Sequence, residues 1–384
     1  MKKTKTGSQG RERRQDLIKK IEKLRSSRVI CYVTSCRQNF AGQIASDVLR
    51  PLSLQLREIG KAKKFDLFLI TNGGLVDAPW KVVTLFREYA DNFNVLAPRE
   101  CYSGGTLLSL GADRIITCPE TLLGPVDLQI PAQDMGTSLG RTISVEDIIS
   151  YLQFGRERGG LSDQAALSQM ISDLGGDLNP QFLGNMYRMY LYIRSVAKKL
   201  IKSRNEDLDA VAEDRIIEML AEKSYTHGHG IGPSEGREIG LPIDRAEGEL
   251  LDAIRQLSEE YVTLFEFDVP FETPALQPGE SKSMHLLQAS LESTEKMHVY
   301  DSDVTIKTVY SLPQQLNIQV APNINFPPNI NPNALSQTAH QQLSSILEQF
   351  KQELESAILQ QIIGQLPVQG IDYQVRDGYW KEVT

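Results

Sequence analysis

The sequence has no long hydrophobic run, and this absence excludes a membrane-spanning helix. No apolar stretch approaches the roughly 18 residues that such a helix needs, and the N-terminus has no apolar core of the kind found in secretory signal peptides. Hydrophobic residues still make up 41% of the 384 residues and charged residues 23%, which is ordinary for a globular protein. We therefore expect a folded protein of the cytoplasm.

Cysteine is scarce, and its spacing excludes a redox motif. Cys31, Cys36, Cys101 and Cys118 form no Cys-x-x-Cys pair, and three of them fall in or beside predicted strands, so we expect reduced thiols packed in the core. Cys101 lies two residues before Ser103 and is alternatively a reactive thiol. Phosphate-binding loops, ATPase motifs and clusters with metal-ligand spacing are also absent, so the sequence predicts no cofactor and no metal.

The net charge of −8 hides an uneven distribution. Residues 1–28 contain eleven Lys or Arg and three acidic residues, so this segment is basic and the remainder is strongly acidic. A basic amphipathic segment can bind anionic lipid or nucleic acid. Its few apolar residues favour packing against the domain or a neighbouring subunit instead, so we expect no nucleic-acid partner and keep membrane contact as the alternative.

A serine stands where a helix is expected to begin, in the stretch Arg-Glu-Cys-Tyr-Ser-Gly-Gly-Thr at 99–106. A strand is predicted over 93–97 and an apolar helical segment over 106–112. Unpaired N–H groups and the positive end of the macrodipole at a helix N-terminus favour a nearby oxyanion, which suits Ser103 as a nucleophile. The alternative is that Ser103 only caps the helix.

A second glycine pair follows another predicted strand. Residues 65–71 are typical of a buried strand and lead directly into Asn-Gly-Gly at 72–74 and an amphipathic helix over 75–90. Acyl transfer needs two backbone donors facing one oxyanion, and the N–H groups of Gly74 and Gly104 supply them if the two strands are neighbours. An ordinary turn is the alternative at this glycine pair.

Two later segments contain the groups that a nucleophilic serine needs. Asp127 follows a Gly-Pro turn, where a carboxylate can orient an imidazole. His227 and His229, in the stretch Tyr-Thr-His-Gly-His-Gly-Ile at 225–231, are candidates for the general base. The alternatives are a solvated capping aspartate, surface histidines and a metal pair, which lacks further ligands nearby.

The order of these motifs resembles the serine dehydrogenase proteinase family, a branch of the Clp-fold serine proteinases related to the Clp peptidase and to signal peptide peptidase A. The motifs are Gly73-Gly74, Ser103 to Thr106, Gly124 to Asp127, Thr226-His227 and Ile239 to Ile243. The resemblance spans approximately residues 29–265 and implies Ser103 as nucleophile, Asp127 as acid and His227 as base. His229 stays an alternative base, because Gly228 and His229 intervene after the Thr-His pair.

Alternating strand and helix patterns predict an α/β fold with a parallel sheet. The predicted strands are 29–34, 65–71, 93–97 and 114–118. The resemblance implies a Clp/crotonase-like fold of stacked ββα units with a helical insertion, for which helices are predicted over 144–154, 162–174 and 180–203. Because such an insertion carries subunit contacts in Clp-fold relatives, we expect a homo-oligomer.

We expect four parts along the chain: a basic N-terminal segment (1–28), a Clp-fold serine proteinase domain (29–265), a linker rich in Pro and Asn (266–335) and a C-terminal helix with a tail (336–384). The long amphipathic helix is predicted over 337–366. Its broad apolar face needs a partner, so we expect self-association or a regulatory partner that docks through this C-terminal region.

Two classes of function follow. The first is a serine endopeptidase acting on a protein or peptide substrate through Ser103, Asp127 and His227. The second is a catalytically silent scaffold on the same fold that recruits partners through its C-terminal helix. Acyl-CoA chemistry on a crotonase-like fold is a further alternative, although it does not require the three side chains.

Overall fold

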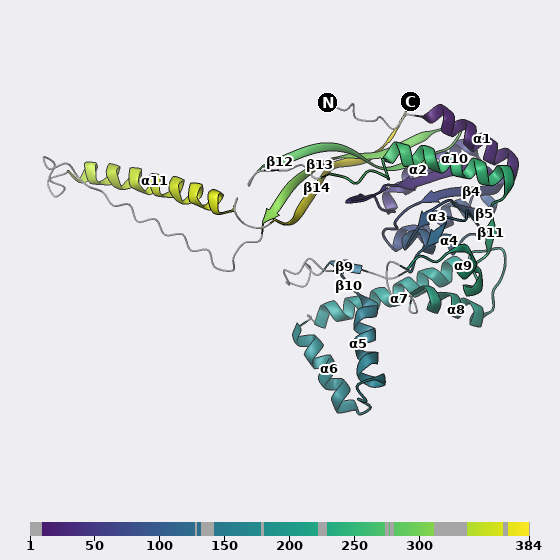
Figure 1. Ribbon diagram of the computed structural model, residues 1–384, viewed down its shortest axis with the longest axis horizontal. Coiled ribbons are helices and arrows are strands. Elements are labelled where there is room, and N and C mark those ends of the chain that lie inside the picture. Colours follow the sequence, from purple (N-terminus) through teal and green to yellow (C-terminus); the bar gives the residue numbers. More distant parts are fainter. Residues whose placement is uncertain are drawn as a thin grey trace. The chain divides into compact units, whose positions relative to one another are not determined.

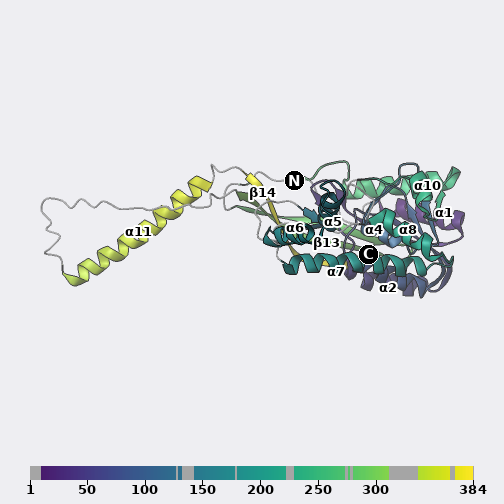
Figure 2. The same ribbon diagram turned by 90° about the horizontal axis from the view of Figure 1, so that it is seen from below.

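The computed structural model describes residues 10–126, 129–131, 142–177, 180–221, 229–272, 276, 280–310, 336–363 and 368–383. The chain forms two compact units. One contains Met1–Phe271, Leu287–Asp301 and Tyr379–Thr384, and the other contains Glu272–Leu286 and Ser302–Gly378. Helices and strands alternate through the first unit (Figures 1 and 2), so the predicted α/β class is confirmed.

The main sheet has eight strands in the order β11-β7-β5-β4-β1-β12-β13-β14. The strands from β11 to β1 are parallel, and β12 pairs antiparallel with β1. These strands are β1 (Arg28–Thr34), β4 (Ala62–Ile70), β5 (Ala90–Ala97), β7 (Arg114–Thr117), β11 (Ile243–Arg245), β12 (Ser281–Glu292), β13 (Met297–Tyr310) and β14 (Val368–Glu382).

Short strands pair outside this sheet: β2 (Cys36–Arg37) with β3 (Phe40–Ala41), β6 (Glu100–Cys101) with β8 (Leu122–Leu123), and β9 (Gln129–Pro131) with β10 (Thr142–Ser144). The helices are η1 (Ser46–Val48), α1 (Arg11–Arg25), α2 (Leu49–Ile59), α3 (Asp77–Arg87), α4 (Gly104–Ser109), α5 (Val145–Glu157), α6 (Gln164–Asp177), α7 (Pro180–Lys202), α8 (Ala210–Ala221), α9 (Pro233–Ile239), α10 (Gly248–Phe265) and α11 (Gln337–Ile363).

Alternation along the central strands builds two apolar cores, because successive side chains point to opposite faces of a sheet. On β1, Ile30 and Tyr32 join the core covered by α2, α3, α4, α7 and α8. Cys31 and Val33 join the core covered by α1 and α10, which lie side by side. The apolar stripe of α1 faces this second core, with Ile18 fully buried, so the expected packing of the basic segment is confirmed.

The described part of the helical insertion follows the predicted pattern closely. Helices α5, α6 and α7 cover the three predicted segments, with ends shifted by up to three residues. No helix among the described residues is both long enough and apolar enough to cross a bilayer.

The region expected to be a linker differs from the prediction, because residues 281–310 form β12 and β13. These strands contain many polar residues, which weaken the local strand signal. Their place is set by pairing, since β12 aligns Ala289 with Thr34 and Leu291 with Tyr32 of the central strand β1. Tertiary pairing of this kind overrides weak local propensity. The C-terminal tail also enters a strand, β14.

The carboxyl ends of the parallel strands lie along one edge of the sheet, where α/β proteins hold ligands. The segment after β4 is 71–76, the segment after β5 contains Ser103, and the segment after β7 leads to β8. The glycine pair, Ser103 and the segment that leads to Asp127 thus all follow strands that end at this edge.

A buried charge cluster joins three remote parts of the first unit. Arg14 of α1 donates to Glu292 of β12 (Nε to Oε2, 2.6 Å), and Tyr261 of α10 donates its hydroxyl to the same oxygen (2.9 Å). All three side chains are fully buried. The Arg14 guanidinium also lies over the Tyr261 ring, 5.3 Å from its centroid. The cluster therefore fixes both helices against the end of β12, next to the β12–β13 turn.

Removing one charge of this cluster leaves the other charge buried and unpaired. We expect Arg14→Met to lower the free energy of unfolding by about 3–5 kcal/mol, measured by denaturant titration. Combining it with Glu292→Leu should restore part of this loss, because no buried charge is left. Arg255→Met, which breaks the exposed pair with Glu120, serves as the control and should change stability little. If Arg14→Met and Arg255→Met lowered the free energy of unfolding equally, the buried cluster would not have the stabilising role assigned to it.

Candidate active site

Ser103 lies on a sharp, strained turn between β6 and α4. Its φ of 47° and ψ of −110° fall in a region that residues with a side chain rarely adopt, and such strain collects at functional sites. Ser103 occupies the N-cap position of α4, yet its side chain makes no capping hydrogen bond. The Ser103 side chain therefore does not cap the helix, and the residue is partly exposed to solvent.

The helix after Ser103 is anchored by its own hydroxyl groups. Thr106 Oγ1 donates to the carbonyl of Cys101 (2.8 Å), and Ser109 Oγ donates to the carbonyl of Gly105 (2.9 Å). Both side chains are fully buried. Bonds of this kind hold a six-residue helix that would be marginal alone, so the first turn of α4 is fixed under Ser103.

The glycine pair after β4 presses against this turn. A Cβ on Gly73 would lie 2.7 Å from Ser103 Cβ and 3.0 Å from the Gly104 nitrogen, and the φ of Gly73 is +114°. A Cβ on Gly74 would overlap the backbone of Ile44. Glycine is required at both positions, because a side chain would push the two segments apart.

The two expected backbone donors lie next to each other. The Gly74 nitrogen is 3.1 Å from the position that a Cβ on Gly104 would occupy. Neither the Gly74 nor the Gly104 nitrogen donates a hydrogen bond to another residue that the structure describes. The strands β4 and β5, which precede the two glycine pairs, are neighbours in the sheet. The sequence analysis required this arrangement for both N–H groups to face one oxyanion.

Asp127 and His227 lie outside the described residues, but the backbone on either side of each is described. The Gly124 nitrogen donates to Thr106 Oγ1 (2.9 Å), and a Cβ on Gly124 would lie 2.5 Å from the Tyr102 ring. The segment that leads to Asp127 is therefore held against the residues flanking Ser103.

The same segment also contacts both ends of the stretch that contains His227. The Val126 nitrogen donates to the carbonyl of Leu220 (2.9 Å), at the end of α8. Leu123 and Ile231 exchange two backbone hydrogen bonds, at 2.9 and 2.7 Å. Residues 123–126 thus link the elements before and after His227 to the turn at Ser103.

His229, the alternative base, is described and exposed. Its Nε2 lies 2.9 Å from Glu235 Oε1, so a carboxylate of α9 occupies one ring nitrogen. No group of three His, Cys, Asp or Glu side chains arranged to hold a metal occurs among the described residues.

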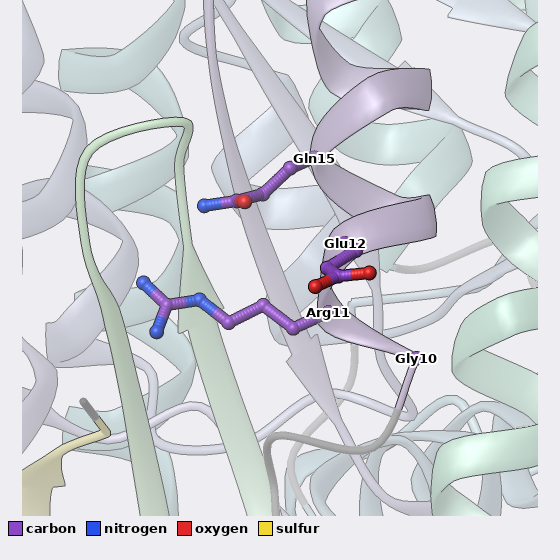
Figure 3. A pocket seen from close by; sticks show the side chains of 4 residues that line it. All are labelled: Gly10, Arg11, Glu12 and Gln15. Carbon is purple, nitrogen blue, oxygen red and sulfur yellow. The ribbon is translucent and has the colours of Figure 1, made fainter.

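A cavity of about 560 Å³ lies away from this site (Figure 3). Its described lining is Gly10, Arg11, Glu12 and Gln15, at the start of α1. Gln15 Nε2 donates to the carbonyl of Thr294 (3.3 Å). Because no residue of the stretch 99–106 lines it, this cavity does not mark the site around Ser103.

The sequence pattern did not single out three residues that the structure places here: Ile44, Thr71 and Tyr102. Ile44 bonds both sides of Gly74, through its N–H to Gly73 (2.7 Å) and its carbonyl to Leu75 (2.8 Å). Such partners come from other parts of the chain, so the sequence near the glycine pair does not reveal them. The one local signal is Thr71, which stands at the end of the predicted strand, two residues before Gly73.

The first part of the chain matches a known protein family. Residues 3–144, which include the glycine pair, Ser103 and Asp127, match the family of ClpP-like SDH-type serine proteinases. The resemblance found from the motifs is thereby confirmed, and the match places the protein among the serine peptidases.

Two relatives and two solved structures are similar over more of the chain. The uncharacterized proteins MJ0137 and MJ1495 of Methanocaldococcus jannaschii are 25% and 23% identical over 70% and 66% of this chain, and 82% and 80% of their own lengths. The 1510-N membrane-bound stomatin-specific protease, bound to a substrate peptide, aligns at 18% identity and a TM-score of 0.33, over 59% of this chain and 80% of its own. ClpP1 from Listeria monocytogenes aligns at 15% identity and a TM-score of 0.32, over 60% of this chain and 98% of its own.

Relieving the backbone strain at Ser103 should stabilise the folded protein. The free energy of unfolding of Ser103→Gly is expected to be about 1 kcal/mol higher than that of Ser103→Ala, because only glycine adopts this backbone conformation freely. Thermal and denaturant unfolding of the two variants measure the difference. A less stable glycine variant would contradict the strained turn.

Cys101 is expected to be unreactive in the folded protein. Full burial raises the pKa of its thiol to about 12, and only the thiolate attacks alkylating agents. At pH 8 iodoacetamide should leave Cys101 unmodified in native protein and modify it after unfolding, as read by peptide mass spectrometry. Rapid native modification would support the alternative of a reactive thiol.

Proposed function

We propose that the protein is a serine endopeptidase in which Ser103 is the nucleophile, His227 the general base and Asp127 the acid that orients it. The observation that carries this proposal is the adjacency of the Gly74 and Gly104 nitrogens beside a strained, uncapped Ser103. Two backbone N–H groups without described partners are what an oxyanion hole requires.

The proposed reaction uses these groups in turn. His227 removes the hydroxyl proton as Ser103 Oγ attacks the peptide carbonyl carbon, and the N–H groups of Gly74 and Gly104 stabilise the oxyanion that forms. The protonated imidazole then donates to the leaving amine, which departs and leaves an acyl-enzyme. Water, deprotonated by the same base, releases the acid product and restores Ser103.

Chain reach supports the roles of Asp127 and His227. Asp127 is three residues after Gly124, which allows at most about 10 Å between their Cα atoms. His227 is four residues before Ile231, which allows about 13 Å. Because Gly124 bonds Thr106 of α4 and Ile231 bonds Leu123, both residues are within reach of Ser103. His229 is the alternative base, and its contact with Glu235 favours His227.

The substrate class is a protein or peptide, and the domain that cleaves it is residues 29–265. We also propose self-association through the helical insertion, where large apolar side chains are exposed. They are Tyr151, Phe154, Ile171, Tyr187, Leu191 and Tyr192. A cytoplasmic location is part of the same proposal.

A regulatory partner is proposed for the C-terminal region. Helix α11 exposes Ile346 and Phe350, so its described apolar side chains remain open to a partner. This observation also favours the second candidate function, a silent scaffold, which predicts binding without chemistry at Ser103.

Labelling with a fluorophosphonate serine probe distinguishes the two functions. We expect wild type to be labelled, Ser103→Ala to lose labelling, and His227→Ala to label at least about a hundredfold more slowly. Asp127→Asn should also be slow, because the imidazole is no longer held in the right tautomer. His229→Ala should label like wild type.

Peptide mapping identifies the labelled serine, and circular dichroism checks that each variant is folded. Ser53→Ala, a serine at α2 away from the site, is the matched control. Absence of labelling in folded wild type would favour the scaffold. If His229→Ala lost labelling and His227→Ala kept it, His229 would be the general base instead of His227.

A further inference from the structure

Thr71, at the end of β4, contacts both segments that supply the proposed oxyanion donors. Its backbone N–H donates to the carbonyl of Glu100 and its carbonyl accepts from Tyr102, each at 3.0 Å. These two bonds form a parallel bridge with Cys101. Thr71 therefore fixes the short strand β6, which ends two residues before Ser103.

The Thr71 hydroxyl holds the glycine pair. Its Oγ1 accepts from the Gly73 N–H (2.9 Å) and from the Thr34 hydroxyl (2.8 Å), and it donates to the Gly73 carbonyl (3.3 Å). A hydroxyl has one donor and two acceptor sites, so all three are used. Both threonines are fully buried, which shields these bonds from competing water.

The methyl group of Thr71 faces the other donor segment. A Cβ on Gly105 would lie 2.5 Å from Thr71 Cγ2, so the first turn of α4 rests directly on this side chain. One residue therefore sets the spacing between Gly73-Gly74 and Ser103-Gly104.

The carbonyl of Gly73 decides where the Gly74 N–H points. A trans peptide is planar, so its C=O and N–H point in opposite directions. The Gly73 carbonyl accepts from the Ile44 N–H (2.7 Å) as well as from the Thr71 hydroxyl. Holding the oxygen on that side turns the Gly74 N–H away from Ile44 and Thr71 and leaves it available to a substrate oxygen.

We propose that Thr71 is the positioning residue of the oxyanion hole: its hydroxyl orients the Gly73–Gly74 peptide so that the Gly74 N–H meets the oxyanion formed at Ser103. The inference rests on the proposed peptidase function and extends it to a residue that does not touch the substrate. Thr34 supports the same peptide through Thr71.

The test compares Thr71→Val, which keeps the shape and removes the hydroxyl, with Thr71→Ser, which keeps the hydroxyl. Saturation kinetics of fluorophosphonate labelling separate the maximal rate from the probe affinity. We expect Thr71→Val to lower the maximal rate by about tenfold to a hundredfold, somewhat less than loss of a whole donor, with unchanged affinity. Thr71→Ser should recover most of the rate.

Two further measurements separate positioning from general stability. The midpoint of the pH–rate profile should be the same in Thr71→Val and wild type, because the base is untouched. Thr117→Val is the matched control, since Thr117 is a buried threonine on β7 whose hydroxyl bonds the carbonyl of Asp244. It should lower the melting temperature like Thr71→Val and leave labelling unchanged.

The outcomes separate the two levels of the proposal. Unlabelled wild type would overturn the peptidase function itself. Labelled wild type with an equally fast Thr71→Val would overturn the role of Thr71 alone. Equal losses in Thr71→Val and Thr71→Ser, or a loss in Thr117→Val that follows its melting temperature, would show a structural effect and would also overturn it.

Discussion

The backbone bridge between Thr71 and Cys101 is the constraint on which the site depends. It joins the ends of two parallel strands, β4 and the short β6, after the main sheet has stopped pairing there. The glycine pair and the turn at Ser103 both begin one or two residues beyond it. Their close approach follows from this bridge and from the absence of side chains on Gly73, Gly74 and Gly104.

A layer of side-chain hydroxyl groups extends this constraint to the rest of the sheet edge. Thr71 links the glycine pair to β1 through Thr34, and Thr106 links α4 to Gly124. Buried hydroxyls with all their partners present are rigid, because each lost bond would leave an unsatisfied polar group. Catalysis by fixed dipoles needs this rigidity, since a donor that must reorient stabilises an oxyanion less.

A buried charge cluster stabilises the core on the other face of the sheet, which α1 and α10 cover. Arg14, Tyr261 and Glu292 come from α1, α10 and β12, which are more than two hundred residues apart along the chain at their extremes. Such a buried cluster contributes less to stability than an apolar packing of the same volume, but it specifies which partners can meet. It explains why the basic N-terminal helix and the segment Leu287–Asp301, which contains the hairpin turn, belong to the same unit.

The sequence by itself determined the α/β class, the parallel strands and the paired glycines beside Ser103, because these depend on local periodicity and on the special conformations of glycine. Only the tertiary structure decided that β12 and β13 join the central sheet, since their many polar residues weaken the local strand signal. It also decided that Ile44, Thr71 and Thr34 surround the glycine pair. Contacts between residues far apart in the chain leave no periodic trace in one sequence, because they are chosen by packing and hydrogen-bond satisfaction in three dimensions.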